Sequence, residues 1–281
     1  MPTYATPAPI TAVIELVAGD VRIIASDRAD TVVTVRPHDE SKEFDVKTAA
    51  TTRVDYADGK LLVKSPKPLQ VYLTSKSTAV DVTVELPTGS HLRGTTAQGD
   101  LICEGRLGDC TFRTYDGDIV VHEAHHVRLT TVNGRITADR ITGDARVTGS
   151  GEVRLTEIGG AAHVKNLNGP SWIGQAAGDI HVNSAHGDII VDRPGQRIVA
   201  RTASGSVRLY ELTHGEAVLQ TASGEVEIGI RQGSAAWLDV RSSNGQVHNE
   251  LDTTAGPERT EETVQVRART LDGDILIRRA A

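Results

Sequence analysis

The chain has 281 residues, of which 38% are hydrophobic but only 3% aromatic, and its net charge is −7 from 30 basic and 37 acidic residues. A core must therefore be built from aliphatic side chains. The acidic balance argues against a general nucleic-acid binder, because phosphate contacts need clustered Lys and Arg. No run of about 18 apolar residues occurs, so we expect no membrane-spanning helix.

The N-terminus and the cysteines indicate a compartment. The first ten residues, MPTYATPAPI, contain no basic segment followed by an apolar one, so we expect no signal peptide and a cytoplasmic location. The two cysteines are Cys103 and Cys110. In a reducing compartment we expect both to remain free thiols rather than to form a disulfide.

Residues 1–94 contain stretches in which apolar and polar residues alternate, which is the pattern of a half-buried strand. The clearest are ITAVIELVAGDVRIIAS (10–26), DTVVTVRP (30–37) and VDVTVELPTGSHL (80–92). A polar, Lys-containing stretch lies between them at 41–60, and the prolines of SPKPLQVYLTSKS (65–77) predict a loop. We predict a β-rich N-terminal section, 1–94, that begins a stack of strands and shields its first open edge.

From residue 95 onward the chain repeats a glycine, then a polar residue, then alternating apolar positions. The clearest copies are TASGSVRL (202–209) and TASGEVEI (221–228). The glycines recur every 17 to 19 residues as far as Gly224 and then after 21 and 28 residues. A repeat of this length cannot bury an apolar face alone, so neighbouring repeats must stack. The glycines are Gly99, Gly117, Gly134, Gly151, Gly169, Gly187, Gly205, Gly224, Gly245 and Gly273.

Fixed positions around these glycines share a chemical character. Apolar side chains lie two and four residues after nearly all of these glycines, with mostly polar ones between them, which is the period of a strand. A weaker copy of this pattern fills the other half of each repeat. We therefore predict an all-β fold, a β-solenoid over 95–281 with coils of about 18 residues, two short strands per coil and almost no helix. A β-sandwich is the alternative.

Three residues before each glycine lies a small side chain suited to hydrogen bonding the backbone at a turn. These side chains are Thr96, Thr114, Thr131, Thr148, Asn166, Ser184, Thr202, Thr221, Ser242 and Thr270.

Directly after many glycines lies an aspartate, and we interpret these pairs as turns in which glycine supplies a positive φ. Calcium-binding β-rolls need a different, nine-residue pattern. The histidines at 122, 125 and 126 have no accompanying carboxylate or cysteine pattern, so we predict no metal and no cofactor.

Outward-facing charges form stripes. Coils lie about 4.8 Å apart, so like charges in one column repel unless they are paired or solvated, and neutral interruptions follow from stability alone. A basic face beside an acidic edge is also suited to binding a partner. His163 and His181 are 18 residues apart and are expected to stack on neighbouring coils. The basic stripe, four residues before the glycines, comprises Arg113, Lys165, Arg201, Arg241 and Arg269.

Trp172 interrupts the pattern. In LNGPSWIGQ (167–175) the expected apolar position holds Ser171, and Trp172 falls in the outward phase. Two interpretations are open: Trp172 belongs to a small exposed apolar contact site, or a one-residue bulge turns it inward. Outward Asp139, Asp192 and Arg208 fall on neighbouring coils, but any long solenoid yields such a set.

The ordered stretches VAGDVRIIASDRADTVVTVRP, VDVTVELPTGS, GDLICEGRLGDCTFRT, GSGEVRLTEIGG, AAWLDVRSSNGQVHNELD and EETVQVRARTLDGDILIRR resemble the actinobacterial branch of a bacterial β-strand-repeat family of unknown function, labelled "putative adhesin". The resemblance covers almost the whole chain. It implies a β-solenoid and offers no catalytic motif to transfer.

These observations favour a non-enzymatic β-solenoid scaffold that acts as a protein-interaction or self-assembly module. No nucleophile elbow, P-loop or dinucleotide fingerprint is present. We expect a protein partner or a second copy, and neither nucleic acid nor membrane. The alternatives are a carbohydrate-binding or carbohydrate-cleaving solenoid, and an acidic rod that mimics nucleic acid through one continuous acidic face. The candidate binding residues are Trp172, Arg113, Lys165, Arg201, His163 and His181.

Overall fold

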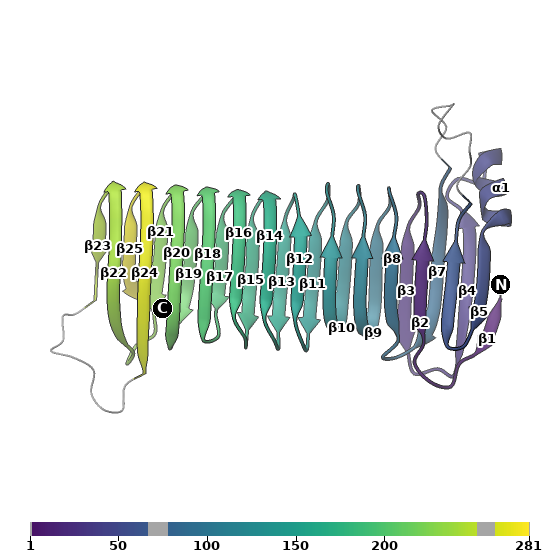
Figure 1. Ribbon diagram of the computed structural model, residues 1–281, viewed down its shortest axis with the longest axis horizontal. Coiled ribbons are helices and arrows are strands. Elements are labelled where there is room, and N and C mark those ends of the chain that lie inside the picture. The colour runs from purple at the N-terminus through teal and green to yellow at the C-terminus, as the bar shows by residue number, and fades with distance from the viewer. Residues whose placement is uncertain (1, 67–77, 252–261, 281) are drawn as a thin grey trace. The chain divides into compact units, whose positions relative to one another are not determined.

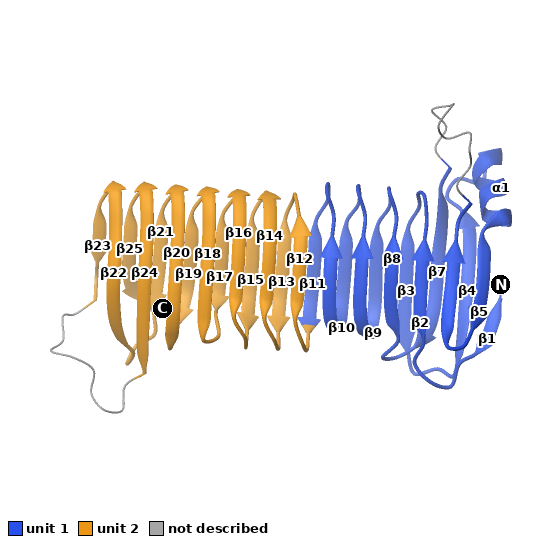
Figure 2. Cartoon of the chain, in the orientation of Figure 1, with its two compact units in different colours: residues 1–140 blue, residues 141–281 orange. Residues whose placement is uncertain are grey.

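The computed structural model describes residues 2–66, 78–251 and 262–280, and it divides into two compact units, 1–140 and 141–281 (Figure 2). Within each unit the strands stack as parallel coils, which confirms the predicted β-solenoid (Figure 1). The predicted boundary after residue 94 falls inside the first unit. Of the predicted loop at 65–77, residues 67–77 lie outside the described residues.

Unit 1 combines parallel coils with antiparallel strands. Its elements are β1 (Thr3–Ala5), β2 (Thr11–Glu15), β3 (Val21–Ser26), β4 (Asp30–Pro37), α1 (Glu43–Thr51), β5 (Arg53–Ala57), β6 (Lys60–Lys64), β7 (Val80–Pro87), β8 (His91–Thr95), β9 (Leu101–Arg113), β10 (Ile119–Thr130) and β11 (Ile136–Ile141). β2 pairs in parallel with β6 and β8, and β3 with β7 and β9. β4 runs antiparallel to β1 and β7, and β5 to β6. The N-terminal strands therefore extend the parallel stack.

Helix α1 was not predicted from the polar stretch at 41–60. Its only buried side chains are Asp45 and Thr48, and the Asp45 carboxylate accepts a hydrogen bond from the Ala79 N–H at 3.0 Å. After α1, β5 and β6 form a hairpin through Asp58 and Gly59, which both have positive φ as a two-residue type I′ turn requires. No helix of the described residues is long and apolar enough to cross a membrane.

Unit 2 consists of two parallel sheets. Its strands are β12 (Ala145–Gly149), β13 (Val153–Ile158), β14 (Ala162–Asn168), β15 (Ser171–Ala176), β16 (Ile180–His186), β17 (Ile189–Arg193), β18 (Arg197–Ser204), β19 (Val207–Leu212), β20 (Gly215–Ser223), β21 (Val226–Ile230), β22 (Ala235–Asn244), β23 (Val247–Asn249), β24 (Thr263–Asp272) and β25 (Ile275–Arg279). The first sheet contains β12, β14, β16, β18, β20, β24 and β22 in this order. The second sheet contains β13, β15, β17, β19, β21, β25 and β23.

The last coil in the sequence is not the last in space. β24 lies between β20 and β22, and β25 lies between β21 and β23. The coil formed by β22 and β23, here called the terminal coil, therefore ends the stack of described strands in unit 2. This insertion accounts for the irregular glycine spacing around Gly245, whose neighbour in space is Gly273 and not Gly224.

The columns predicted from the repeat form the core and its hydrogen bonds. Val207 and Leu209 are each 1% exposed, and the corresponding Val226 and Ile228 are fully buried. The threonine hydroxyls bond turn carbonyls as predicted, and they also reach the preceding coil. For example, Thr221 Oγ1 donates to the Gly205 carbonyl at 2.9 Å. Each coil is thus tied to its neighbour by a side chain as well as by the sheet.

The repeating glycines are required by the close approach of the coils. Gly224 has a φ of +148°, and a Cβ placed on it would lie 2.1 Å from the Gly205 carbonyl oxygen. Such a contact is sterically forbidden, and this φ is itself open mainly to glycine.

The two cysteines are free and buried in unit 1, as expected. Both belong to β9. Burial raises the pKa of the Cys103 thiol, and the adjacent Cys110 thiol raises it further, so Cys103 stays protonated and inert at neutral pH.

Candidate functional site

Four of the six predicted binding residues share the outer face of the first sheet of unit 2. Lys165, Arg201, Arg269 and Arg241 lie in one column. Neutral side chains on β16 and β20 interrupt this column on either side of Arg201. The Arg201 guanidinium donates to Gln220 at 2.9 Å. The neutral residues place Lys165 and Arg201 two coils apart, about 10 Å, which reduces their repulsion.

A shallow groove of about 500 Å³ runs beside this column. Arg201 and Arg269 are among the residues that line the groove, and Ala203, Ala222 and Leu271 contribute apolar surface. Leu271 is 60% exposed. The sequence analysis missed the groove, although the repeated TASG motif already contained the alanines.

His163 and His181 stack as predicted. Their ring centroids are 5.1 Å apart and the rings are inclined by only 6°. Burial lowers the pKa of His163, and the nearby positive charges of His181 and Arg146 lower it further. His163 is therefore neutral at pH 7 and adds no charge to this face.

Trp172 lies on the outer face of the second sheet, between buried Ser171 and Ile173, so the inward bulge is not observed. The Arg154 guanidinium carbon lies 3.9 Å from the indole ring centroid. The indole N–H donates to Asp192 at 3.2 Å. Trp172 is thus already held by its neighbours on adjacent coils. The structure brings it onto a different sheet from His163, Lys165, His181 and Arg201.

Arg113 is the sixth predicted residue and belongs to unit 1. It is exposed at the end of β9, where its register neighbours are Thr95 and Thr130. Neither neighbour is charged, so Arg113 belongs to no continuous basic stripe within unit 1.

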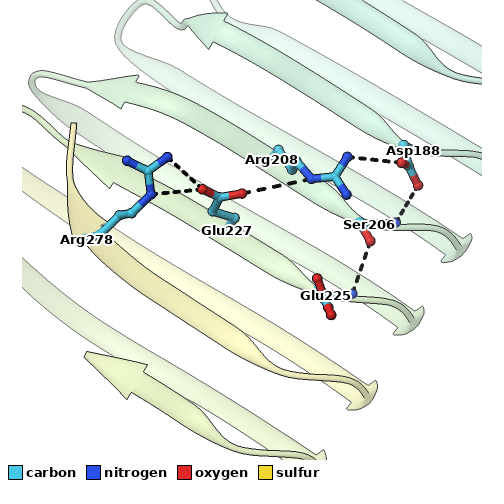
Figure 3. Close-up of polar contacts among 6 residues, drawn as sticks. All are labelled: Asp188, Ser206, Arg208, Glu225, Glu227 and Arg278. Atoms are coloured by element: carbon cyan, nitrogen blue, oxygen red, sulfur yellow. Dashed lines mark hydrogen bonds and ion pairs between the residues drawn. The ribbon is translucent and has the colours of Figure 1, made fainter. Parts of the chain in front are cut away.

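Opposite charges alternate along part of the second sheet (Figure 3). Asp188 pairs with Arg208 at 3.2 Å, Arg208 with Glu227 at 3.9 Å, and Glu227 with Arg278 at 2.8 Å. These ion pairs offset the repulsion expected between like charges stacked on neighbouring coils. They also differ from the continuous acidic face that a nucleic-acid mimic requires.

Residues that directly follow the glycines form a second set of bonds between coils. Asp188 Oδ1 accepts the Ser206 N–H at 2.8 Å, and Ser206 Oγ accepts the Glu225 N–H at 3.3 Å (Figure 3). In unit 1, Asp100 Oδ1 accepts the Asp118 N–H in the same way. The Gly–Asp pairs therefore join successive turns, which goes beyond the predicted role within a single turn.

The terminal coil presents unsatisfied surface. β22 pairs with β24 on one side, and no strand of the described residues pairs with its other edge. Leu238 and Val240 are half-exposed, although they lie beside Val266 and Ala268, which are at most 1% exposed. Trp237, on the outer face of β22, is 72% exposed. An apolar, unpaired strand edge is a template for association.

A further cluster in unit 1 was not predicted. Ligand atoms of Asp20, His38 and Asp81 lie within 4.8 Å of one another, beside a hollow of about 390 Å³. These groups already bond each other or the backbone: His38 Nδ1 lies 2.9 Å from Asp81 Oδ1, and Asp20 Oδ1 accepts the Asp100 N–H. The Asp81 carboxylate raises the pKa of His38. The three residues are far apart in sequence, so no local motif predicts the cluster.

Stacked parallel coils, inter-coil hydrogen bonds and an open terminal coil define a β-solenoid. The sequence pattern of the Toastrack DUF4097 family matches residues 12–278. The chain therefore belongs to the Toastrack DUF4097 family. A search of curated proteins finds no match.

Two solved structures are similar along most of their length. One is described as a "putative cell adhesion protein" from Clostridium sporogenes, with 11% identity, coverage of 98% of this chain and 97% of that chain, and a TM-score of 0.23. The other is described as a "putative adhesin" from Bacteroides fragilis, with 12% identity, coverage of 99% and 95%, and a TM-score of 0.40. Both structures carry an adhesion label like the one that the sequence resemblance named. The actinobacterial branch stays a prediction.

Proposed function

We propose that the chain is a non-enzymatic self-assembly module whose copies associate through the terminal coil of unit 2. The observation that carries the proposal is the contrast between β22 and β24. Val264, Val266 and Ala268 on β24 are almost completely buried, whereas the residues beside them on β22 are half-exposed. One further strand on the open edge would bury this apolar column and complete the hydrogen bonds of β22.

Half of the backbone groups of β22 are directed at the open edge. The Ala235 N–H donates to the Glu262 carbonyl at 2.9 Å, on the β24 side. Because successive residues of a strand direct their backbone groups to opposite sides, the N–H groups of Ala236, Leu238 and Val240 are directed away from β24. Proline at residue 240 removes an edge-directed donor and leaves the bonds to β24 intact.

The experiment is sedimentation velocity of the whole chain from nanomolar to high micromolar concentration, with Val240→Pro and Val240→Ala compared. We expect wild type to associate as the concentration rises. Val240→Pro should remain monomeric, while Val240→Ala, which keeps the N–H, should still associate. A wild type that stays strictly monomeric would overturn the proposal, as would association unchanged in Val240→Pro. Circular dichroism verifies that both variants are folded.

Carbohydrate binding is the second candidate function, and it rests on exposed tryptophan. Trp172 has one ring face against Arg154, whereas Trp237 is 72% exposed and offers a free ring for stacking on a sugar. A glycan array tests this function. No binding, or affinity unchanged in both Trp172→Ala and Trp237→Ala, would exclude it.

A further inference from the structure

We infer that two copies of this chain are joined by antiparallel pairing of the two β22 strands about a two-fold axis at Val240. The inference rests on the proposed function and specifies the symmetry and the register. A two-fold interface uses the same surface on both copies, so β22 must be complementary to itself when its direction is reversed. Its sequence, AAWLDVRSSN, meets this condition at one register.

The backbone restricts the possible registers. The groups of Ala236, Leu238 and Val240 are directed at the open edge, and so by alternation are those of Ser242. The alternation ends there, because the Asn244 carbonyl accepts the Gly273 N–H on the β24 side. In an antiparallel pair, residues whose groups are directed at the partner must lie opposite one another. Only registers that match even-numbered residues with even-numbered residues are therefore compatible with a full set of hydrogen bonds.

Charge selects among these registers. With the axis at Val240, Asp239 lies opposite Arg241 of the second copy, and Arg241 opposite Asp239 of the second copy. An axis at Asp239 would place the two aspartates opposite each other, and an axis at Arg241 would do the same with the arginines. An axis at Leu238 avoids these clashes but places Asp239 opposite Trp237 and Arg241 opposite Ala235 of the second copy, so it forms no opposite-charge pair.

The charges within one copy agree with this register. Arg241 lies beside Arg269 on β24, a like-charge neighbour, and it forms no ion pair with any described residue. Asp239 is bonded to Arg269 at 2.6 Å on the β24 side. Across the open edge, Asp239 of the second copy would supply the carboxylate that Arg241 lacks. Asp239 and Arg241 would form a non-hydrogen-bonded pair across the open edge, and in such pairs the opposite side chains lie close together.

The inner face is also complementary. Residues opposite each other in an antiparallel pair point to the same face of the sheet. Val240 therefore meets Val240 of the second copy, and Leu238 meets Ser242 of the second copy, all on the inner face. The half-exposed column of the terminal coil becomes part of a core that continues from one copy into the other.

Charge reversal tests the register. In Asp239→Arg both paired positions are positive, and in Arg241→Asp both are negative, so each homodimer contains two like-charge pairs. We expect dimerisation to weaken by roughly 10- to 100-fold in each single variant. An equimolar mixture of the two restores both opposite-charge pairs and should dimerise as wild type does, as should the double variant. Arg146→Asp, on the outer face of β12 in the same sheet but distant from β22, is the matched control and should not change dimerisation.

The outcomes separate the inference from the proposed function. Sedimentation velocity of the two single variants, alone and mixed, with a mass tag on one of them, identifies the heterodimer. If association is abolished by Val240→Pro but insensitive to both reversals, or if the mixture fails to restore it, the two-fold register is wrong while the proposed function stands. Open-ended oligomers instead of dimers would also overturn the inference. A strictly monomeric wild type would overturn both.

Discussion

Replacing Gly224 by alanine should destabilise unit 2 more than any exposed substitution. The φ of +148° costs a residue with a side chain about 1–3 kcal/mol. The new Cβ would lie 2.1 Å from the Gly205 carbonyl oxygen, so the two coils must separate by about 1 Å against a normal spacing of about 4.8 Å. That shift strains the bond from the Gly205 N–H to the Ser223 carbonyl, which joins the same two coils and is 2.9 Å long. We expect a total loss of about 3–5 kcal/mol.

Gly233→Ala is the matched control. Gly233 also has a positive φ, +87°, but no atom lies within 4 Å of the added Cβ. It should lose only the conformational part, about 1–2 kcal/mol. Urea unfolding followed by circular dichroism measures both variants, and equal losses would refute the argument that coil spacing demands glycine. Because solenoid repeats unfold partly independently, hydrogen exchange around Gly205 should locate the weakened interface.

Two further predictions concern the side chains of unit 2. Thr221→Val removes the hydroxyl that bonds the Gly205 carbonyl, and urea unfolding should show a loss of about 1 kcal/mol that Thr221→Ser largely avoids. The pKa of His163 is lowered in the folded state, so the unfolded chain binds the proton more tightly. The contribution of His163 is therefore fully present above the unfolded-state pKa of about 6.5 and decreases as the pH falls below it. The melting temperature of His163→Gln should fall less on acidification than that of wild type; an identical fall would contradict the assignment.

The sequence predicts the coils well because a solenoid brings neighbours in sequence together in space. The two repeats TASGSVRL and TASGEVEI each contain a threonine, a glycine and two buried apolar positions. The threonine, the glycine and the apolar pair all have the predicted roles. Helix α1 escaped prediction because it buries only Asp45 and Thr48, so no apolar stripe marks it. Its position depends on the contact between Asp45 and Ala79, which are 34 residues apart.

The candidate site was less predictable. The basic column was found because Lys165 and Arg201 follow the repeat, but the repeat says nothing about which coil ends the stack. The glycine spacing records only that the coil after Gly224 is irregular. In the structure β20 pairs with β24 and not with β22, which leaves Leu238 exposed. The repeat pattern is the same in both strands, so it does not predict which of them pairs with β20.

The inserted position of β24 and β25 also sets the order in which the chain can be completed. A ribosome releases residues 235–249 before 263–279, yet the native neighbours of the earlier segment are the later ones. The terminal coil therefore cannot reach its place until residues 263–279 have left the ribosome. Strands β24 and β25 are held between two coils and are protected from fraying, whereas the coil that docks after them precedes them in the sequence.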